Sequence, residues 1–129
     1  MNYLSREARR EAVSDEQLND LIIDCIQDIK GKNIVKLDLR QLKEAPADFF
    51  IICEGDSNTQ IRAIGDRIEQ RVRDEAHLKA YHVEGKDFGR WVLLDYYNTL
   101  VHVFHPEARA YYDLEDLWSD AQVTSYENL

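Results

Sequence analysis

One short apolar run constrains the fold of this 129-residue chain more than any other feature. Residues 49–53, Phe-Phe-Ile-Ile-Cys, contain no polar side chain, which is typical of a strand covered on both faces. Gly55 follows, and Ser57-x-x-Gln60 then gives the capping-box pattern that begins a helix. That helix continues with apolar residues at spacings of three and four: Ile61, Ile64, Ile68 and Val72. Residues 48–75 thus predict a strand, a tight turn and a helix, and residues 78–83 can supply the next strand of a right-handed crossover.

The rest of the chain adds two helices and three strands. Ser14-x-x-Gln17 is another capping box, and the helix that it begins carries an apolar stripe formed by Leu18, Leu21, Ile22, Cys25, Ile26 and Ile29. Alternating residues 34–39 predict a half-buried strand. Residues 91–95 and 100–104 predict two strands joined by a short hairpin, with Asn98 as the residue at positive φ. Pro106 suits the first turn of a final helix that runs to about Ala121.

This order of elements predicts a single α/β domain, in which a mixed sheet of about five strands is flanked by helices. We expect residues 1–13 to be a flexible lead-in, residues 14–121 to form the domain, and residues 122–129 to be a loose polar tail. The chain has no apolar run near the roughly 18 residues that a membrane span needs and no signal-peptide core at its start. We therefore expect a cytoplasmic protein without a membrane partner.

The charge balance narrows the kinds of partner. The formal net charge is −9, whereas a surface that binds phosphates broadly is basic. Little direct contact with nucleic acid is expected, and an acidic chain is attracted to basic partners. Cys25 and Cys53 lie in apolar stretches without a nearby histidine, so we expect two reduced, buried packing residues.

No residue pattern requires catalysis, a cofactor or a metal. Gly55-Asp56-Ser57 resembles the phosphate-holding turn of nucleotidyl-transferring enzymes, but those enzymes also need a carboxylate pair for two Mg²⁺ ions. Asp95 has no acidic neighbour two residues away, and Asp56 would repel a phosphate. His102 and His105 stand three apart on a strand-like segment, which places them on opposite faces. Ser57 and Cys53 have no local base, and no nucleophile elbow is present.

Aromatic residues are dense towards the C-terminus. Tyr, Trp and Arg dominate the energetics of protein interfaces, and this region holds more large side chains than one small core needs: Phe88, Trp91, Tyr96, Tyr97, Phe104, Tyr111, Tyr112 and Trp118, with Arg90 and Arg109. Residues 106–129 add six acidic residues. The pattern favours a protein-binding module with an acidic edge.

Several strings of this sequence resemble the bacterial ribosomal silencing factor family, also called the Iojap family. They cover roughly residues 17–121: DFFIICEGDS at 48–57 with Gln60 and Ala63-Ile64, Glu84-Gly85, WVLLDY at 91–96, VHVF at 101–104, Arg109, YDLE at 112–115 and LWSDA at 117–121. The string from Val101 to Ala121 is too specific to be expected by chance.

The resemblance implies a translation repressor rather than an enzyme. Members of the family bind the fourteenth protein of the large ribosomal subunit and block its joining with the small subunit when nutrients are scarce. Their fold is related to that of nucleotidyltransferases but lacks the catalytic acids, and homodimers are considered plausible. A nucleotide-binding or nucleotidyl-transferring enzyme on a related fold is the alternative.

We expect the partner-binding face to contain Trp91, Asp95, Tyr96, His102 and Arg109, supported by Glu84, Tyr112 and Trp118. The spacing of Trp118 from Leu114 and Leu117 also suits core packing. The chain departs from the family at the hairpin, where Tyr97-Asn98-Thr99 replaces a common Gly-Asp pair. A tyrosine in place of glycine must either change the turn or put an aromatic ring at its tip.

Overall fold

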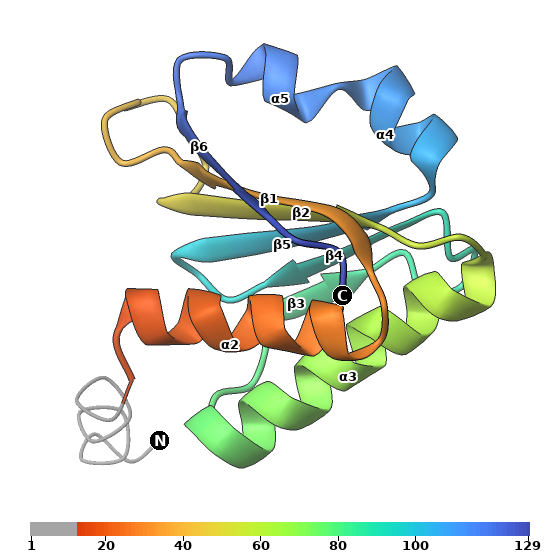
Figure 1. Cartoon of the computed structure of the whole chain (residues 1–129). Helices are drawn as coiled ribbons and strands as arrows, with labels where there is room; N and C mark the ends of the chain where they lie inside the picture. The colour runs from red at the N-terminus through yellow and green to blue at the C-terminus, as the bar shows by residue number, and fades with distance from the viewer. Residues whose placement is uncertain (1–12) are drawn as a thin grey trace.

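The computed structural model describes residues 13–129, which form a six-stranded mixed sheet between two layers of helices (Figure 1). The strands, in the spatial order β3-β4-β5-β2-β1-β6, are β3 (His82–Glu84), β4 (Trp91–Asp95), β5 (Thr99–Phe104), β2 (Phe49–Glu54), β1 (Lys32–Asp38) and β6 (Gln122–Tyr126). The helices α2 (Asp15–Asp28) and α3 (Asn58–Ala76) cover one face, and the short helices α4 (Pro106–Tyr112) and α5 (Leu114–Leu117) lie over the other. The predicted lead-in lies outside the described residues except for Val13, which packs against the α2–α3 side.

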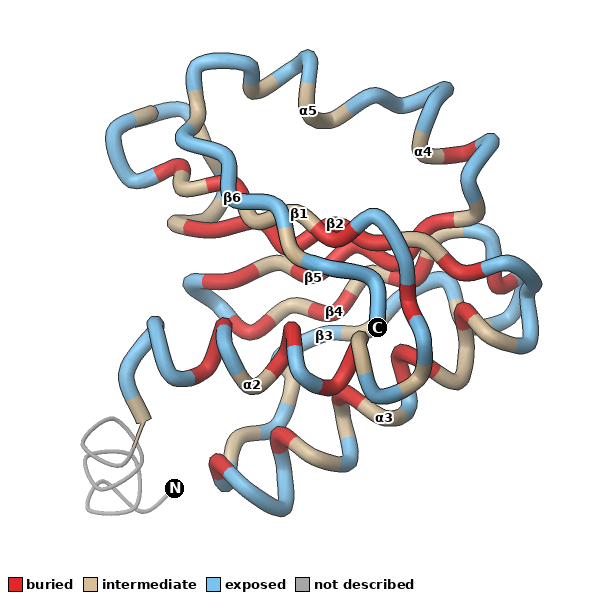
Figure 2. The backbone as a smooth tube through the Cα atoms, in the orientation of Figure 1, coloured by how far each residue is buried: buried red, intermediate tan, exposed pale blue. Residues whose placement is uncertain are grey.

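The centre of the sheet is a parallel pair, β2 and β5; every other pairing is antiparallel. All residues of β2 except Glu54 are buried (Figure 2). This strand is the apolar run of the sequence, and the prediction that both of its faces are covered is confirmed.

The alternation of side chains along the strands divides the core in two. Ile51 and Cys53 of β2 face α2 and α3, within a cluster that includes Ile22, Ile26 and Ile64. Phe50 and Ile52 face the other way, where they meet Leu37, Leu39, Phe104 and Ala108. Both cysteines are free and buried, as predicted, and burial raises the pKa of the Cys25 thiol to about 11 and that of Cys53 to about 12.

The two long helices begin as the sequence predicts, but their caps differ. At α2 the capping box is complete, because the Ser14 hydroxyl accepts from the Gln17 amide and the Gln17 side chain accepts from the Ser14 amide. At α3 the Ser57 hydroxyl caps the amide of Gln60, while the Gln60 side chain accepts from Asp56 and donates to the carbonyl of Ile29. Gln60 therefore ties the start of α3 to the end of α2.

The C-terminal segment corrects the prediction of a loose tail and a sheet of about five strands. Residues 122–126 form β6, a sixth strand that pairs with β1 at the edge of the sheet. Four of its five residues are exposed, so the segment lacks the apolar alternation that would predict a strand from the sequence. Backbone pairing with β1 holds it in place, and beyond it the Asn128 side chain accepts from the Asn33 amide.

Two further predictions are wrong in detail, each because one residue has a positive φ. The single final helix is interrupted at Asp113, which adopts a left-handed φ of 45° and separates α4 from α5. In the β4–β5 hairpin the residue at positive φ is Tyr97 (68°), not Asn98. The Asp95 carboxylate accepts from the Tyr97 amide, and the Tyr97 ring packs against Tyr81. These contacts hold a conformation that favours glycine.

A nearly buried guanidinium joins α4 to the sheet. The Arg109 side chain is 10% exposed; its Nη1 lies 3.0 Å from Glu54 at the end of β2, and its Nη2 lies 2.9 Å from Glu115 in α5. Nη1 also donates to the carbonyl of Asn33, which has a positive φ of 52° at the point where the register of β1 shifts against β2. Arg109 thus connects α4, α5 and the neighbouring strands β1 and β2.

Arg109→Ala should lower the free energy of unfolding by about 2 to 4 kcal/mol, because it leaves two partly buried carboxylates without their cation. Urea unfolding followed by circular dichroism measures this loss. Arg90→Ala is the matched control: Arg90 lies 3.9 Å from Glu107 with both side chains exposed, so its removal should cost about 0.5 kcal/mol or less. Equal losses in the two variants would contradict a structural role for the Arg109 pairs.

Candidate partner-binding surface

The β3–β4 end of one sheet face is less covered than its centre. Residues paired directly across strands share a face, which gives three rows: Trp91 with Phe104, Leu93 with Glu84 and His102, and Asp95 with His82 and Leu100. Glu84 and His82 are exposed, and Trp91, Leu93 and Asp95 are half-buried. This face continues the second core outward to solvent. We call the solvent-accessible part of this face the β3–β4 surface; it is formed by His82, Glu84, Trp91, Leu93 and Asp95, together with Tyr112 of α4.

Trp91 lies at the inner border of the β3–β4 surface, between core and solvent. Its ring packs against Phe104 and Tyr112, with centroids 4.8 Å and 4.6 Å away. Its Nε1 donates to Nδ1 of His102 at 3.1 Å. One edge of the indole is therefore fixed by packing and a hydrogen bond, which presents the half-buried ring in a defined orientation.

His102 supports this surface from below. Its side chain faces away from Val101 and Val103, as the alternation predicts, and packs against Phe50 with ring centroids 4.6 Å apart. Only 4% of the residue is exposed, so it cannot contact a partner in this conformation. The prediction of a direct contact is wrong for His102, because the aromatic side chains around it exclude solvent.

The protonation state of His102 follows from its surroundings. Burial lowers its pKa to about 3, from an ordinary value of 6.5. Nδ1 accepts from Trp91, so the proton of the neutral ring is on Nε2, which has no hydrogen-bond partner among the described residues. The site holds a neutral imidazole.

The remaining predicted contacts fall into two groups. Glu84, Asp95 and Tyr112 keep solvent-accessible surface on the same face as Trp91. Tyr96 is 6% exposed and packs in the α2–α3 core, on the opposite face, where burial raises its phenol pKa. Tyr96 therefore cannot form a contact on this face, and its predicted role as one is wrong.

Arg109 and Trp118 also serve the fold. Arg109 is predicted to lie on the partner-binding face, but its charge is matched within the fold by Glu54 and Glu115. Trp118 packs edge-on against Phe50, with ring centroids 6.3 Å apart. This position agrees with its spacing from Leu114 and Leu117, which suits core packing.

The glycine turn after β2 is built for packing. A side chain at Gly55 would place its Cβ 2.8 Å from Ile61, so only glycine fits here without movement. Asp56 pairs with Lys32 at 2.9 Å, and Ser57 caps α3. Within residues 13–129 no three His, Cys, Asp or Glu side chains are grouped in a way that could hold a metal ion.

Two strongly exposed aromatic residues lie outside the predicted partner-binding face. Phe88, in the loop before β4, and Tyr111, in α4, are 80% and 82% exposed. Their aromatic character gave no means of separating them from core residues. Only their positions, in the loop and on the outer side of α4, distinguish them from core residues.

Over the described part of the chain, no helix combines the length and apolarity needed to cross a membrane.

His102 should make the protein sensitive to acid. Its folded pKa lies below its unfolded value, so as pH falls below about 6.5 the unfolded chain gains a proton that the folded protein excludes, and stability decreases until about pH 3. Between pH ~8 and pH ~5 this contributes a loss of about 2 kcal/mol. Urea unfolding at both pH values measures it.

The acid-dependent loss should shrink in His102→Asn, whose amide oxygen can accept from Trp91 but does not titrate. His77→Asn, which removes an exposed histidine at the C-cap of α3, should keep the wild-type loss. The same pH dependence in His102→Asn and in the wild type would contradict the assignment.

Comparison with known proteins identifies the family. The family model described as "Ribosomal silencing factor during starvation" matches residues 12–129. The chain is 37% identical over 117 residues to a ribosomal silencing factor from Halalkalibacterium halodurans, covering 91% of this chain and 98% of that protein. It is 42% identical over 94 residues to the factor from Bacillus subtilis, covering 73% and 78%.

Solved structures agree with the sequence relatives. A crystal structure of a Chromobacterium violaceum protein superposes with a TM-score of 0.78 at 36% identity, covering 83% of this chain and 88% of that one. A second, from Bacillus halodurans, gives a TM-score of 0.71 at 34% identity, covering 88% and 99%. Plant Iojap proteins match more distantly: a mitochondrial Iojap-related protein of Arabidopsis thaliana is 34% identical over 77 residues, 57% of this chain and 41% of that one. The chain belongs to the ribosomal silencing factor family.

Proposed function

We propose that this protein represses translation by binding the large ribosomal subunit through its fourteenth protein and by blocking subunit joining, particularly under nutrient limitation. The observation that carries the proposal is the match of the family model across residues 12–129. The relatives named as ribosomal silencing factors support the same regulatory role. This mode of action is steric and needs no catalytic step, cofactor or metal.

The β3–β4 surface is the proposed binding face. It combines a fixed aromatic ring, Trp91, with the carboxylates of Glu84 and Asp95 and the half-exposed ring of Tyr112. Aromatic anchors supply short-range affinity at interfaces. His102 and Arg109 hold the face in shape from beneath and beside it.

Charge supports a basic protein partner. With a net charge of −9, the chain is attracted to the positive surfaces typical of ribosomal proteins, and such attraction raises the rate of encounter. The same charge disfavours direct binding to ribosomal RNA. We place the protein in the cytoplasm, where its partner is assembled, and include a homodimer as a further form of the free protein.

Trp91→Ala should weaken binding to purified large subunits about tenfold or more, because it removes the central aromatic anchor. Co-sedimentation with separate large and small subunits, scored also for whole-ribosome formation, measures the loss. Trp118→Ala is the matched control, since it removes an aromatic ring from the same core outside the β3–β4 surface. Comparable losses of affinity in both variants would indicate core destabilisation instead of a lost contact.

Glu84→Arg should weaken binding several-fold at low salt and less at high salt, because it places a positive charge against a basic partner. Glu84 is 62% exposed in its side chain, so the fold should tolerate the change. Asp20→Arg makes the same change of charge on the exposed side of α2 and should bind nearly as the wild type does. Equal weakening by the two variants would assign the effect to net charge alone.

Selective pelleting of the wild type with large subunits, together with fewer whole ribosomes, is the expected outcome. Binding to both subunits alike, or to neither, would overturn the proposed function.

A further inference from the structure

The loop between β3 and β4 is held more firmly than a surface connection requires. Gly85 and Gly89 have positive φ values of 92° and 69°, and the Gly89 amide donates to the Gly85 carbonyl at 3.0 Å, which closes a single turn. A side chain at Gly85 would place its Cβ 1.9 Å from the carbonyl oxygen of Trp91. The turn is therefore packed directly against the start of β4.

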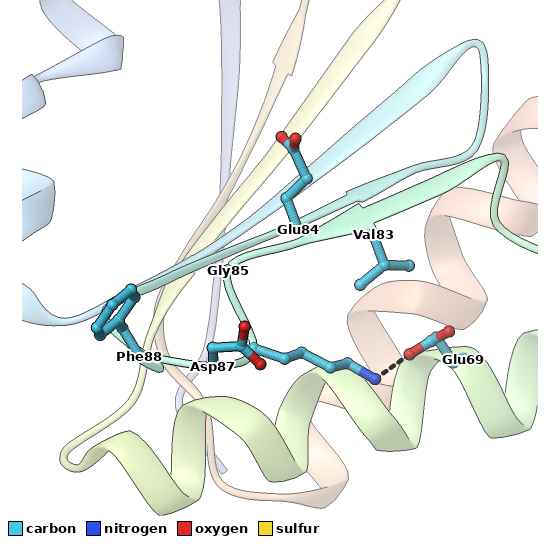
Figure 3. A pocket seen from close by; sticks show the side chains of 7 residues that line it. Glu69, Val83, Glu84, Gly85, Asp87 and Phe88 are labelled. Atoms are coloured by element: carbon cyan, nitrogen blue, oxygen red, sulfur yellow. Dashed lines mark hydrogen bonds and ion pairs between the residues drawn. The ribbon is translucent and has the colours of Figure 1, made fainter.

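Arg62 and Lys86 fix the same turn to α3. The Arg62 guanidinium donates from Nε to the Lys86 carbonyl and from Nη2 to the Asp87 carbonyl, both at 2.6 Å. The Lys86 ammonium reaches back to Asp66 and Glu69 on α3; Figure 3 shows its contact with Glu69. On the other side, the His105 amide donates to the Arg90 carbonyl at 2.8 Å, which joins the loop to the start of α4.

This firmly held turn presents an apolar side chain to solvent. Phe88 is 80% exposed and is one of the residues that line the depression beside the loop; in Figure 3 its ring points away from α3. Exposed Asp87 lies beside it, and Glu84 lines the same depression. A rigid backbone lowers the entropy cost of binding, and an aromatic ring within an acidic rim complements a basic surface that has an apolar recess.

The loop is also continuous with the β3–β4 surface. Glu84 ends β3 immediately before Gly85, and Trp91 begins β4 two residues after Gly89. A partner that covers Trp91 and Glu84 therefore meets this loop at its border.

We propose that the Gly85–Gly89 turn is a second contact element, which inserts Phe88 into an apolar recess of the basic protein partner. This inference rests on the proposed function and adds a residue to its binding face. Arg62 acts as a positioning residue, because its two hydrogen bonds hold the consecutive carbonyl groups of Lys86 and Asp87, directly before Phe88.

Phe88→Ser tests the proposal in the full-length protein. Affinity for purified large ribosomal subunits, measured by titrated co-sedimentation, should fall about tenfold, with most of the change in the dissociation rate. Tyr81→Ser is the matched control: Tyr81 is 66% exposed but lies at the other end of β4, where its amide donates to the Asp95 carbonyl. It should bind within about twofold of the wild type. Thermal unfolding should be unchanged in Phe88→Ser, since the ring is exposed.

The positioning role of Arg62 requires a double-variant measurement. Arg62→Lys keeps the positive charge but cannot make both hydrogen bonds of the guanidinium. It should weaken binding less than Phe88→Ser does. The loss in the double variant should be smaller than the product of the two single losses. A loss of affinity in the double variant equal to the product of the two single losses would overturn the role given to Arg62.

The outcomes separate this inference from the function on which it rests. If the wild type binds large subunits and Trp91→Ala weakens binding while Phe88→Ser does not, the second contact element is overturned and the proposed function stands. If the wild type fails to bind large subunits, the proposed function is overturned and the partner assigned to Phe88 with it. A loss of equal size in Tyr81→Ser would also overturn the assignment of Phe88.

Discussion

The parallel pairing of β2 with β5 is the constraint on which the rest of the structure depends. Two adjacent strands buried on both faces need a covering layer on each side, since apolar side chains alternate between the faces. The helices α2 and α3 supply one layer from contiguous amphipathic segments. The other layer is assembled from α4, α5 and the loop after β1. It is less complete, and its open end is where the β3–β4 surface lies.

The second layer depends on electrostatics as much as on apolar packing. Arg109 enters this layer with 10% of its side chain exposed and is matched by two carboxylates and a carbonyl from the shifted register of β1. A nearly buried cation is tolerated only when such partners are present. The position of α4, and with it that of Tyr112 against Trp91, follows from this arrangement.

The candidate binding face is accordingly supported by polar interactions beneath it. A neutral histidine beneath Trp91 fixes the indole by one hydrogen bond, at the cost of an Nε2 proton without a partner among the described residues. The β3–β4 loop adds a second firm element at the border of the same face. Both the β3–β4 surface and the β3–β4 loop hold an aromatic ring on a rigid backbone. Such a rigid face suits a protein that is proposed to act sterically, by occupying a surface that another molecule needs.

The sequence by itself determined the elements whose signals are local. The apolar run of β2, the capping serines of α2 and α3 and the alternation of β4 and β5 each lie within a few neighbouring residues, and the structure confirms them. Only the tertiary structure decided the features that depend on distant partners. β6 is held by β1, about 90 residues away in the chain. Tyr97 keeps its positive φ beside Asp95 and Tyr81. Of the residues predicted for the partner-binding face, His102 and Tyr96 are buried and Arg109 is held by ion pairs within the fold. Residue type and spacing indicate which side chains are suited to an interface, but burial is set by what packs over them, and that is a non-local property.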